Sequence, residues 1–114
     1  MNTRIPAQLL AQEIAGRSSC IVQVGAVIED HHGIFAWGWN HAGAGFGCHA
    51  ERHALRRANR HRLDGATVFV AGRYRHNGHW VQSRPCPICE KALRQAGIRR
   101  VKFLDRKQWR EILI

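Results

Sequence analysis

The sequence predicts a single α/β domain over residues 1–114, in which helices sandwich a mixed sheet of four or five strands. Apolar runs rich in β-branched residues alternate with segments whose apolar residues recur at helical spacing, in the order α-β-β-α-β-α-β. With 114 residues, 45% of them hydrophobic, the chain has enough apolar material for one modest core. A second domain is therefore not expected.

The first half of the chain predicts a helix, a hairpin and a second helix. Residues 5–15 have helical apolar spacing and Gly16 follows as a stop signal. Residues 20–28 (CIVQVGAVI) predict a strand, and a turn at 29–33 leads into a second strand at 34–39. Gly43, Gly45 and Gly47 mark a loop before a helix at 49–60, whose arginines fall largely outside its apolar stripe.

The second half predicts a strand, a helix and a further strand. Residues 66–71 (ATVFVA) form the third predicted strand, and a polar stretch follows at 72–84. Pro87 suits the first turn of a helix, and Gly97 suits the cap at its C-terminal end. Residues 101–104 predict a fourth strand, whereas the tail at 105–114 is compatible with a short helix or with a closing strand.

Two short motifs, HAE at residues 49–51 and PCPIC at residues 85–89, open two of the predicted helices. Cys86 and Cys89 lie three residues apart at a helix start, so both thiols can point to one side, and His49 offers a third ligand. Three protein ligands with one open position are typical of a catalytic zinc, which lowers the pKa of a bound water from about 15.7 to roughly 7. Glu51 is not needed as a ligand and can take a proton from that water.

The combination H-x-E and P-C-x-x-C is the signature of zinc nucleobase deaminases, and residues 20–104 resemble the cytidine deaminase superfamily. The segments at 48–51 (CHAE) and 89–101 (CEKALRQAGIRRV) look most like the deoxycytidylate deaminase branch. The resemblance implies a cytidine deaminase-like α-β-α sandwich and a Zn²⁺ ion held by His49, Cys86 and Cys89. It also implies hydrolysis of cytosine to uracil, with Glu51 passing the proton to the ring nitrogen and the departing ammonia.

The same resemblance suggests which residues contact the substrate. The segment WGWN at 37–40 is similar to the strand end where tRNA adenosine deaminases and deoxycytidylate deaminases place an asparagine against the sugar. Asn40 would then bind a ribose or deoxyribose hydroxyl; the alternative is an ordinary turn residue. The backbone N–H of Ala50 and the main chain near Ser83 and Arg84 would read the base edge.

The substrate class is left open by the charge pattern. The chain carries 18 Lys+Arg against 8 Asp+Glu. This excess of positive charge favours an anionic partner, or it serves only to keep a small protein soluble. The motifs favour a free cytosine nucleoside or nucleotide. Cytosine or adenine in single-stranded DNA or RNA is the alternative, because residues 72–84 combine arginines with Tyr74 and Trp80, although core packing is the simpler role for Trp80.

Several other expectations follow from single residues. A structural zinc module is the non-enzymatic alternative; it would leave Glu51 without a role, and His53, one helical turn after His49, would be the residue to close its coordination sphere. Cys20 and Cys48 fit small core residues better than ligands. The first residues lack a long apolar stretch, so a cytoplasmic protein without a membrane contact is expected. A homo-oligomer is expected because a short chain offers few walls for a pocket.

Overall fold

The computed structural model describes residues 5–42 and 49–114. Its elements, in chain order, are α1 (Ala7–Ala15), β1 (Val22–Asp30), β2 (Gly33–Trp39), α2 (Ala50–Arg57), a 3-10 helix η1 (Arg60–Arg62), β3 (Thr67–Tyr74), β4 (Trp80–Val81), α3 (Pro87–Gln95), β5 (Arg100–Asp105) and β6 (Gln108–Leu113). The predicted order of helices and strands is confirmed. Strand β4 was not predicted, and strand β6 lies in the tail for which a short helix and a closing strand were both predicted.

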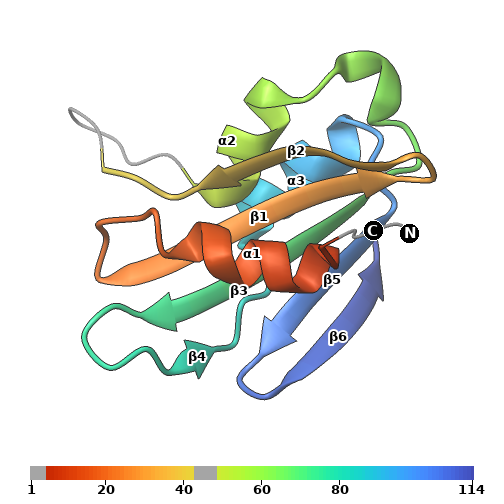
Figure 1. The fold of residues 1–114 in the computed structure, drawn as a ribbon. Helices are drawn as coiled ribbons and strands as arrows, with labels where there is room; N and C mark the ends of the chain where they lie inside the picture. Colours follow the sequence, from red (N-terminus) through yellow and green to blue (C-terminus); the bar gives the residue numbers. More distant parts are fainter. Residues whose placement is uncertain (1–4, 43–48) are drawn as a thin grey trace.

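Among the described residues, one mixed sheet of six strands forms the middle layer, so the predicted four or five strands were too few. Its order is β2-β1-β3-β5-β6, with β4 paired to β3 beside this path. The β3–β5 pair is parallel and all the other pairs are antiparallel. Figure 1 shows α1 on one face of the sheet, with α2 and α3 on the other. The predicted α-β-α sandwich with a mixed sheet is therefore confirmed.

Two apolar clusters hold the three layers together. On the α2 and α3 side, Val68 and Val70 of β3 pack with Leu93 of α3. On the α1 side, Phe69 of β3 packs with Ala11 of α1. Because successive residues of a strand point to opposite faces, a strand that is covered on both faces has to be apolar throughout. The run at residues 66–71 has this composition for that reason.

The tail and the second helix differ from their predicted forms. Residues 108–113 form strand β6, which pairs with β5 along its whole length, so the closing-strand alternative is confirmed and the helix is excluded. The helix predicted at 49–60 ends at Arg57, because Ala58 takes extended backbone angles (φ −79°, ψ 146°). The short η1 follows, and the Asn59 side chain caps it by accepting the N–H of His61.

The other predicted helix ends are confirmed, with α1 ending at Ala15 before Gly16 and α3 ending at Gln95 shortly before Gly97. Gly97 has a φ of 99°, which glycine adopts without strain. The predicted loop glycines at 43, 45 and 47 lie outside the described residues. No helix within the described ranges has the length and apolar character needed to cross a membrane.

Candidate active site

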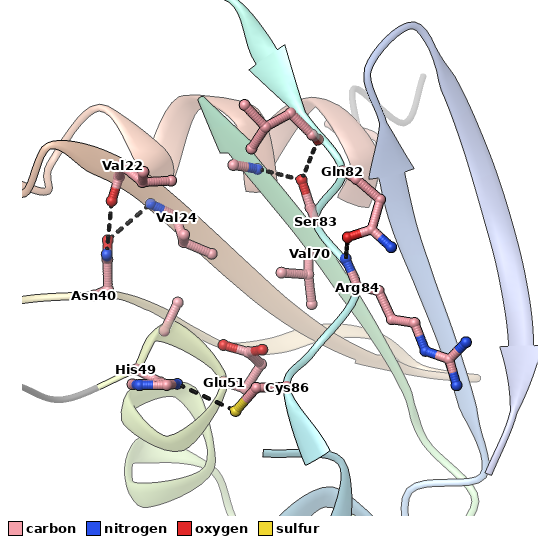
Figure 2. Close-up of a pocket in the computed structure, with 13 residues that line it drawn as sticks. Val22, Val24, Asn40, His49, Glu51, Val70, Gln82, Ser83, Arg84 and Cys86 are labelled. Atoms are coloured by element: carbon pink, nitrogen blue, oxygen red, sulfur yellow. Dashed lines mark hydrogen bonds between the residues drawn. The ribbon is translucent and has the colours of Figure 1, made fainter. Parts of the chain in front are cut away.

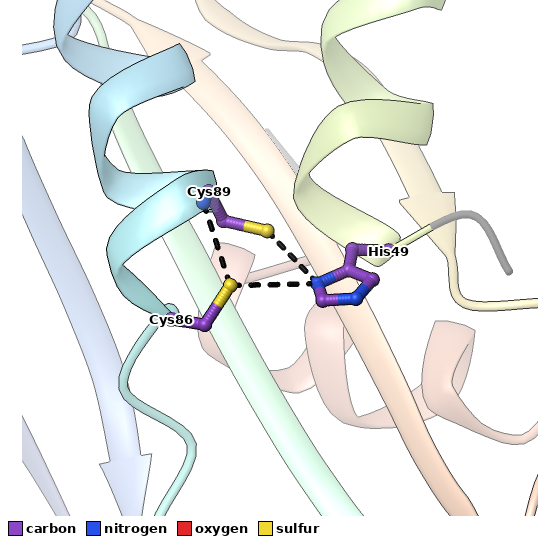
Figure 3. A group of neighbouring side chains, drawn as sticks. All are labelled: His49, Cys86 and Cys89. Atoms are coloured by element: carbon purple, nitrogen blue, oxygen red, sulfur yellow. Dashed lines mark hydrogen bonds between the residues drawn. The ribbon is translucent and has the colours of Figure 1, made fainter. Parts of the chain in front are cut away.

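Three metal-binding side chains converge where α2 and α3 begin (Figure 3). His49 Nδ1 lies 3.0 Å from Cys89 Sγ and 3.7 Å from Cys86 Sγ. All three ligand atoms lie within 4.8 Å of one another. A tetrahedral zinc with Zn–S near 2.3 Å and Zn–N near 2.0–2.1 Å separates its nitrogen and sulfur ligands by about 3.6 Å. The three predicted ligands are therefore placed to hold a zinc ion.

The local structure around the cysteines favours thiolate ligands once a cation is present. Pro87 occupies the start of α3, where its missing N–H costs nothing, and Cys86 caps the helix by accepting the Cys89 N–H at 3.4 Å. Cys89 is buried, and this burial, together with the nearby Glu51 carboxylate, raises the pKa of its thiol. A bound cation and the positive end of the helix dipole oppose that shift.

The described residues supply three ligands and no fourth. His53 was the candidate for a closed site, but its Nδ1 lies 3.1 Å from the amide nitrogen and 3.2 Å from the carbonyl oxygen of Trp39. It therefore binds the β2 backbone instead. Cys20 is half-buried and outside the metal-binding group, whereas Cys48 lies outside the described residues. Within residues 5–42 and 49–114 the site keeps an open position, as a catalytic zinc requires.

Glu51 lies in the first turn of α2, and 5% of its surface is exposed. Figure 2 shows its carboxylate beside Cys86, pointing into the pocket. Burial raises the pKa of this carboxyl above its ordinary value. Such a group holds a proton more readily than an exposed glutamate, as a residue that accepts and returns protons should.

The pocket above the metal ligands has a volume of about 230 Å³. Its walls are apolar, formed by Val22, Val24, Val70 and Val81. Polar groups are confined to a few positions, and the four residues expected to contact substrate are among the lining residues: Asn40, Ala50, Ser83 and Arg84. A few directed polar groups on apolar walls are typical of a small-molecule site.

The Asn40 side chain is bonded to strand β1 as well as lining the pocket. Its Oδ1 accepts the Val24 N–H at 2.7 Å, and its Nδ2 donates to the Val22 carbonyl at 2.8 Å (Figure 2). The amide thus extends the β1–β2 pairing by one residue. An asparagine amide has two N–H donors and two acceptor lone pairs, so one N–H and one lone pair remain for a ligand.

The Ser83 main chain is partly committed as well. Its N–H donates to the Leu104 carbonyl at 2.9 Å, so this group does not face a substrate. Its hydroxyl accepts the Gly72 N–H at 2.7 Å and donates to the Val81 carbonyl at 2.9 Å. The Arg84 N–H, 3.3 Å from Gln82 Oε1, is less tightly bound. Of the two backbone N–H groups, that of Arg84 is therefore the less committed to a partner within the protein.

Most of the basic and aromatic stretch at residues 72–84 lies away from the pocket. Trp80 packs against the apolar cluster on the α1 side, which confirms core packing as its role. Arg73 stacks on Trp80 at 5.5 Å and donates to Gln23 Oε1 at 2.9 Å. Neighbouring strand residues face opposite sides, so Arg73 points away from the pocket that Gly72 lines.

Three features of the site were missed at the level of sequence. Gln82 lines the pocket and pairs with Arg84, yet it stood unmarked in a polar stretch. The exposed Arg52 lies near enough to Cys89 for its charge to oppose the rise in thiol pKa. The valine walls come from three strands, β1, β3 and β4, and a valine in a strand does not by itself indicate a pocket. No local pattern marks such residues, because the fold alone brings them to one place.

Comparisons with known proteins agree with this geometry. A family model described as the cytidine and deoxycytidylate deaminase zinc-binding region matches residues 4–105. The dCMP deaminase of cyanophage S-TIM5 in apo form is 27% identical, with a TM-score of 0.68 over 90% of this chain and 82% of that one. RibD of Acinetobacter baumannii is 26% identical, with a TM-score of 0.61, over 86% of this chain but 27% of that one.

Cytidine deaminase from Burkholderia pseudomallei has the same fold, with a TM-score of 0.70 and 22% identity over 94% of this chain and 89% of that one. No curated protein sequence matches. The family match covers nearly the whole chain and includes all three metal ligands together with Glu51. The chain therefore belongs to the family of cytidine and deoxycytidylate deaminase zinc-binding regions.

Proposed function

We propose that the chain, as one domain over residues 1–114, converts cytosine to uracil in a free cytidine or deoxycytidine nucleoside or nucleotide. The observation that carries this proposal is the placing of Glu51 beside three zinc ligands at one small apolar pocket. Support for the substrate class comes from the cyanophage dCMP deaminase, which is 27% identical. The products of the reaction are uracil and ammonia, and one water is consumed.

Glu51 is the proposed catalytic acid and base. A zinc ion held by His49, Cys86 and Cys89 would supply a water of lowered pKa. The Glu51 carboxylate accepts a proton from the attacking water and delivers it to the ring nitrogen of the base. Glu51 then takes the remaining proton of the hydroxyl group that has been added to the ring carbon and passes it to the amino group, so that the C–N bond breaks, ammonia departs and the carbonyl of uracil forms. Burial keeps these transfers out of bulk solvent and favours the protonated form of Glu51 between them.

The remaining pocket residues position the base and the sugar. Ala50 stands in the first turn of α2, where backbone N–H groups have no partner within the helix, so its N–H suits the carbonyl oxygen of a pyrimidine. The remaining N–H and lone pair of Asn40 suit a sugar hydroxyl. Arg84 lies at the pocket with half of its side chain exposed and within 3.3 Å of Glu90, where a substrate phosphate could pair with it.

Cytosine or adenine in single-stranded DNA or RNA is the second candidate substrate. It is favoured by the exposed arginines of α2, since Arg52 directly follows Glu51 and Arg56 and Arg57 end the helix. A polynucleotide needs such a basic path to its reacting base, whereas a free nucleotide needs one cation at most. The assay described next, which follows uracil formation from each substrate separately, distinguishes the two candidates.

The test compares the zinc-loaded protein with Glu51→Gln. Cytidine, deoxycytidine, their monophosphates and a cytosine-containing single strand are offered separately, and uracil formation is followed. We expect turnover of a free nucleoside or nucleotide, and a loss of about 10²–10⁴-fold in Glu51→Gln with its zinc content unchanged. Turnover of the oligonucleotide alone would move the substrate to the second candidate. Equal inactivity of both proteins on all substrates would leave a structural zinc module.

We also infer that the protein forms a homo-oligomer. Ile21 and Ile88 are 74% and 69% exposed, and each lies within two residues of a pocket residue, Val22 or Cys86. Large exposed apolar side chains beside a pocket favour a covering neighbour. Light scattering measures the mass in solution, and a fully active monomer would contradict this inference.

A further inference from the structure

Four side chains stack alternately at the outer edge of the sheet, in the order Arg17, Trp39, Arg57, Trp37. The guanidinium carbon of Arg57 lies 5.4 Å from the ring centre of Trp37 and 5.7 Å from that of Trp39. The guanidinium carbon of Arg17 lies 5.3 Å from the ring centre of Trp39. These distances are within the range of cation–π contacts. We call this set the arginine–tryptophan ladder.

Three separate elements build the ladder. Trp37 and Trp39 are alternate residues of β2 and so project to the same side of the strand. Arg57 is the last residue of α2, and Arg17 follows the end of α1. Within residues 5–42 and 49–114, strand β2 pairs with β1 and lies at the end of the strand order, so it forms an edge of the sheet (Figure 1).

Contacts with the rest of the protein fix the two tryptophan rings of the ladder. The His53 ring meets the Trp39 ring edge to face at 4.7 Å between centroids, and its Nδ1 is bonded to the Trp39 backbone. Trp37 packs against the apolar cluster beneath α1. Because both rings are anchored, the two guanidinium groups that stack on them lose little further freedom when they bind a ligand.

In the part of the chain that the structure describes, neither ladder arginine has a carboxylate partner. Among residues 5–42 and 49–114, the ion pairs of the protein use other cations, and neither Arg17 nor Arg57 takes part in one. Both arginines are exposed, and the only acid of α2 is the buried Glu51. A guanidinium stacked on a ring keeps its N–H donors in its own plane, where they can meet phosphate oxygens two at a time.

We propose that the arginine–tryptophan ladder binds the phosphate backbone of single-stranded nucleic acid. A row of separated, unpaired arginines matches a row of phosphates better than it matches one small anion. The ladder and the pocket lie at the same end of β2, because Trp39 is followed directly by Asn40, which lines the pocket, but the two side chains project to opposite sides of the strand. The choice of a single strand rests on the second candidate function, deamination of a base within single-stranded DNA or RNA, since a base has to be unpaired to enter such a pocket.

The test measures binding of a fluorescent oligothymidine of about 16 nucleotides by anisotropy. Thymine carries no amino group, so binding is measured without turnover. The zinc-loaded wild type is compared with Arg17→Ala, Arg57→Ala and Arg57→Lys at several salt concentrations. Arg99→Ala is the matched control, because Arg99 is exposed and lies beside Ala66 before the start of β3, away from the pocket.

We expect each ladder alanine variant to weaken binding about fivefold at roughly 0.1 M salt and to reduce the slope of log K against log salt by about 0.7, as the loss of one phosphate contact on a single strand requires. Arg57→Lys should keep the slope and still lose affinity, because an ammonium group cannot stack as a planar fork. Arg99→Ala should bind as the wild type does. Melting midpoints show whether each variant is folded. If only one of Arg17→Ala and Arg57→Ala folds, that variant alone is compared with Arg99→Ala.

Equal weakening in Arg99→Ala and the ladder variants would overturn the proposal, because general charge would then explain the binding. An absence of binding by the wild type near 0.1 M salt, or equal binding of a duplex of the same length, would also overturn it. The proposed deaminase function is tested separately. Binding that persists without turnover of any substrate would remove the deaminase and leave the ladder in place.

Discussion

Gly38→Ala should disturb the fold and the metal centre together, because α2 lies directly on Gly38 of β2. A Cβ atom at this position would lie 2.5 Å from the Ala54 nitrogen and 2.9 Å from the Ala50 carbonyl oxygen. Both are backbone atoms of α2, so no change of rotamer relieves the contact. Ordinary van der Waals contact begins near 3.4 Å, and the helix therefore has to move by about 0.9 Å.

This displacement is large compared with the tolerance of a metal site. Zinc–ligand distances are kept within about 0.2 Å. His49 caps the start of α2 and Glu51 lies in its first turn, whereas the two cysteines lie at the start of α3. Overpacking of this kind costs about 1–3 kcal/mol, and the upper end is expected where backbone meets backbone. For a domain of this size such a loss lowers the melting temperature by roughly 10 °C.

Zinc titration and urea unfolding separate the two effects. The matched control is Gly25→Ala, whose Cβ would lie 2.5 Å from the Ala15 nitrogen in α1, a helix without metal ligands. Both variants should lose stability, and only Gly38→Ala should also lose zinc affinity and turnover. Wild-type zinc affinity in Gly38→Ala, or an equal loss in Gly25→Ala, would refute the reasoning.

Three further predictions concern other contacts. Asn40→Asp places an oxygen where the Nδ2 group now donates to the Val22 carbonyl, so the free energy of unfolding in urea should fall by about 1–3 kcal/mol. The control is Asn77→Asp, which should lose little, because the Asn77 side chain only accepts a hydrogen bond, from the His79 N–H. In the wild type, free zinc at 100 times its Kd should stabilise the fold by about 2.7 kcal/mol and so raise the melting temperature. Cys86→Ser should abolish this rise. Arg62 holds the pKa of Asp30 below its ordinary 3.8, so the pair stabilises the fold above that pH and ceases to do so as pH falls. Asp30→Asn should therefore lower the urea midpoint at pH 7 and approach the wild type in acid.

The metal ligands and the order of the main elements could be predicted because their signals are local. The two motifs are contiguous, and each coincides with a helix start. Strand β4 was missed because two residues, Trp80 and Val81, cannot show a period. Strand β6 stayed ambiguous because it is an edge strand with four of its six residues exposed, including Leu113, so its sequence lacks a buried face.

The hydrogen bonds of the residues expected to contact substrate could not be predicted, because they depend on partners far along the chain. The asparagine at position 40 has the residue type for a sugar contact, yet two of its hydrogen-bonding groups are taken by strand β1, 16 and 18 residues earlier. Similarly, the N–H at Ser83 is taken by Leu104 of β5. Motif similarity indicates which residues reach the pocket, but it does not indicate how much of their hydrogen-bonding capacity is left.

Three successive residues at the end of β2 serve three different neighbours. Gly38 lets α2 approach, Trp39 stacks between two guanidinium groups, and Asn40 pairs with β1 and lines the pocket. Because neighbouring residues of a strand face opposite sides, a slip of one residue would move each of them to the wrong neighbour. The register of β2 therefore controls the position of α2, the side chains at the edge of the sheet and the part of the pocket wall formed by Asn40 at the same time.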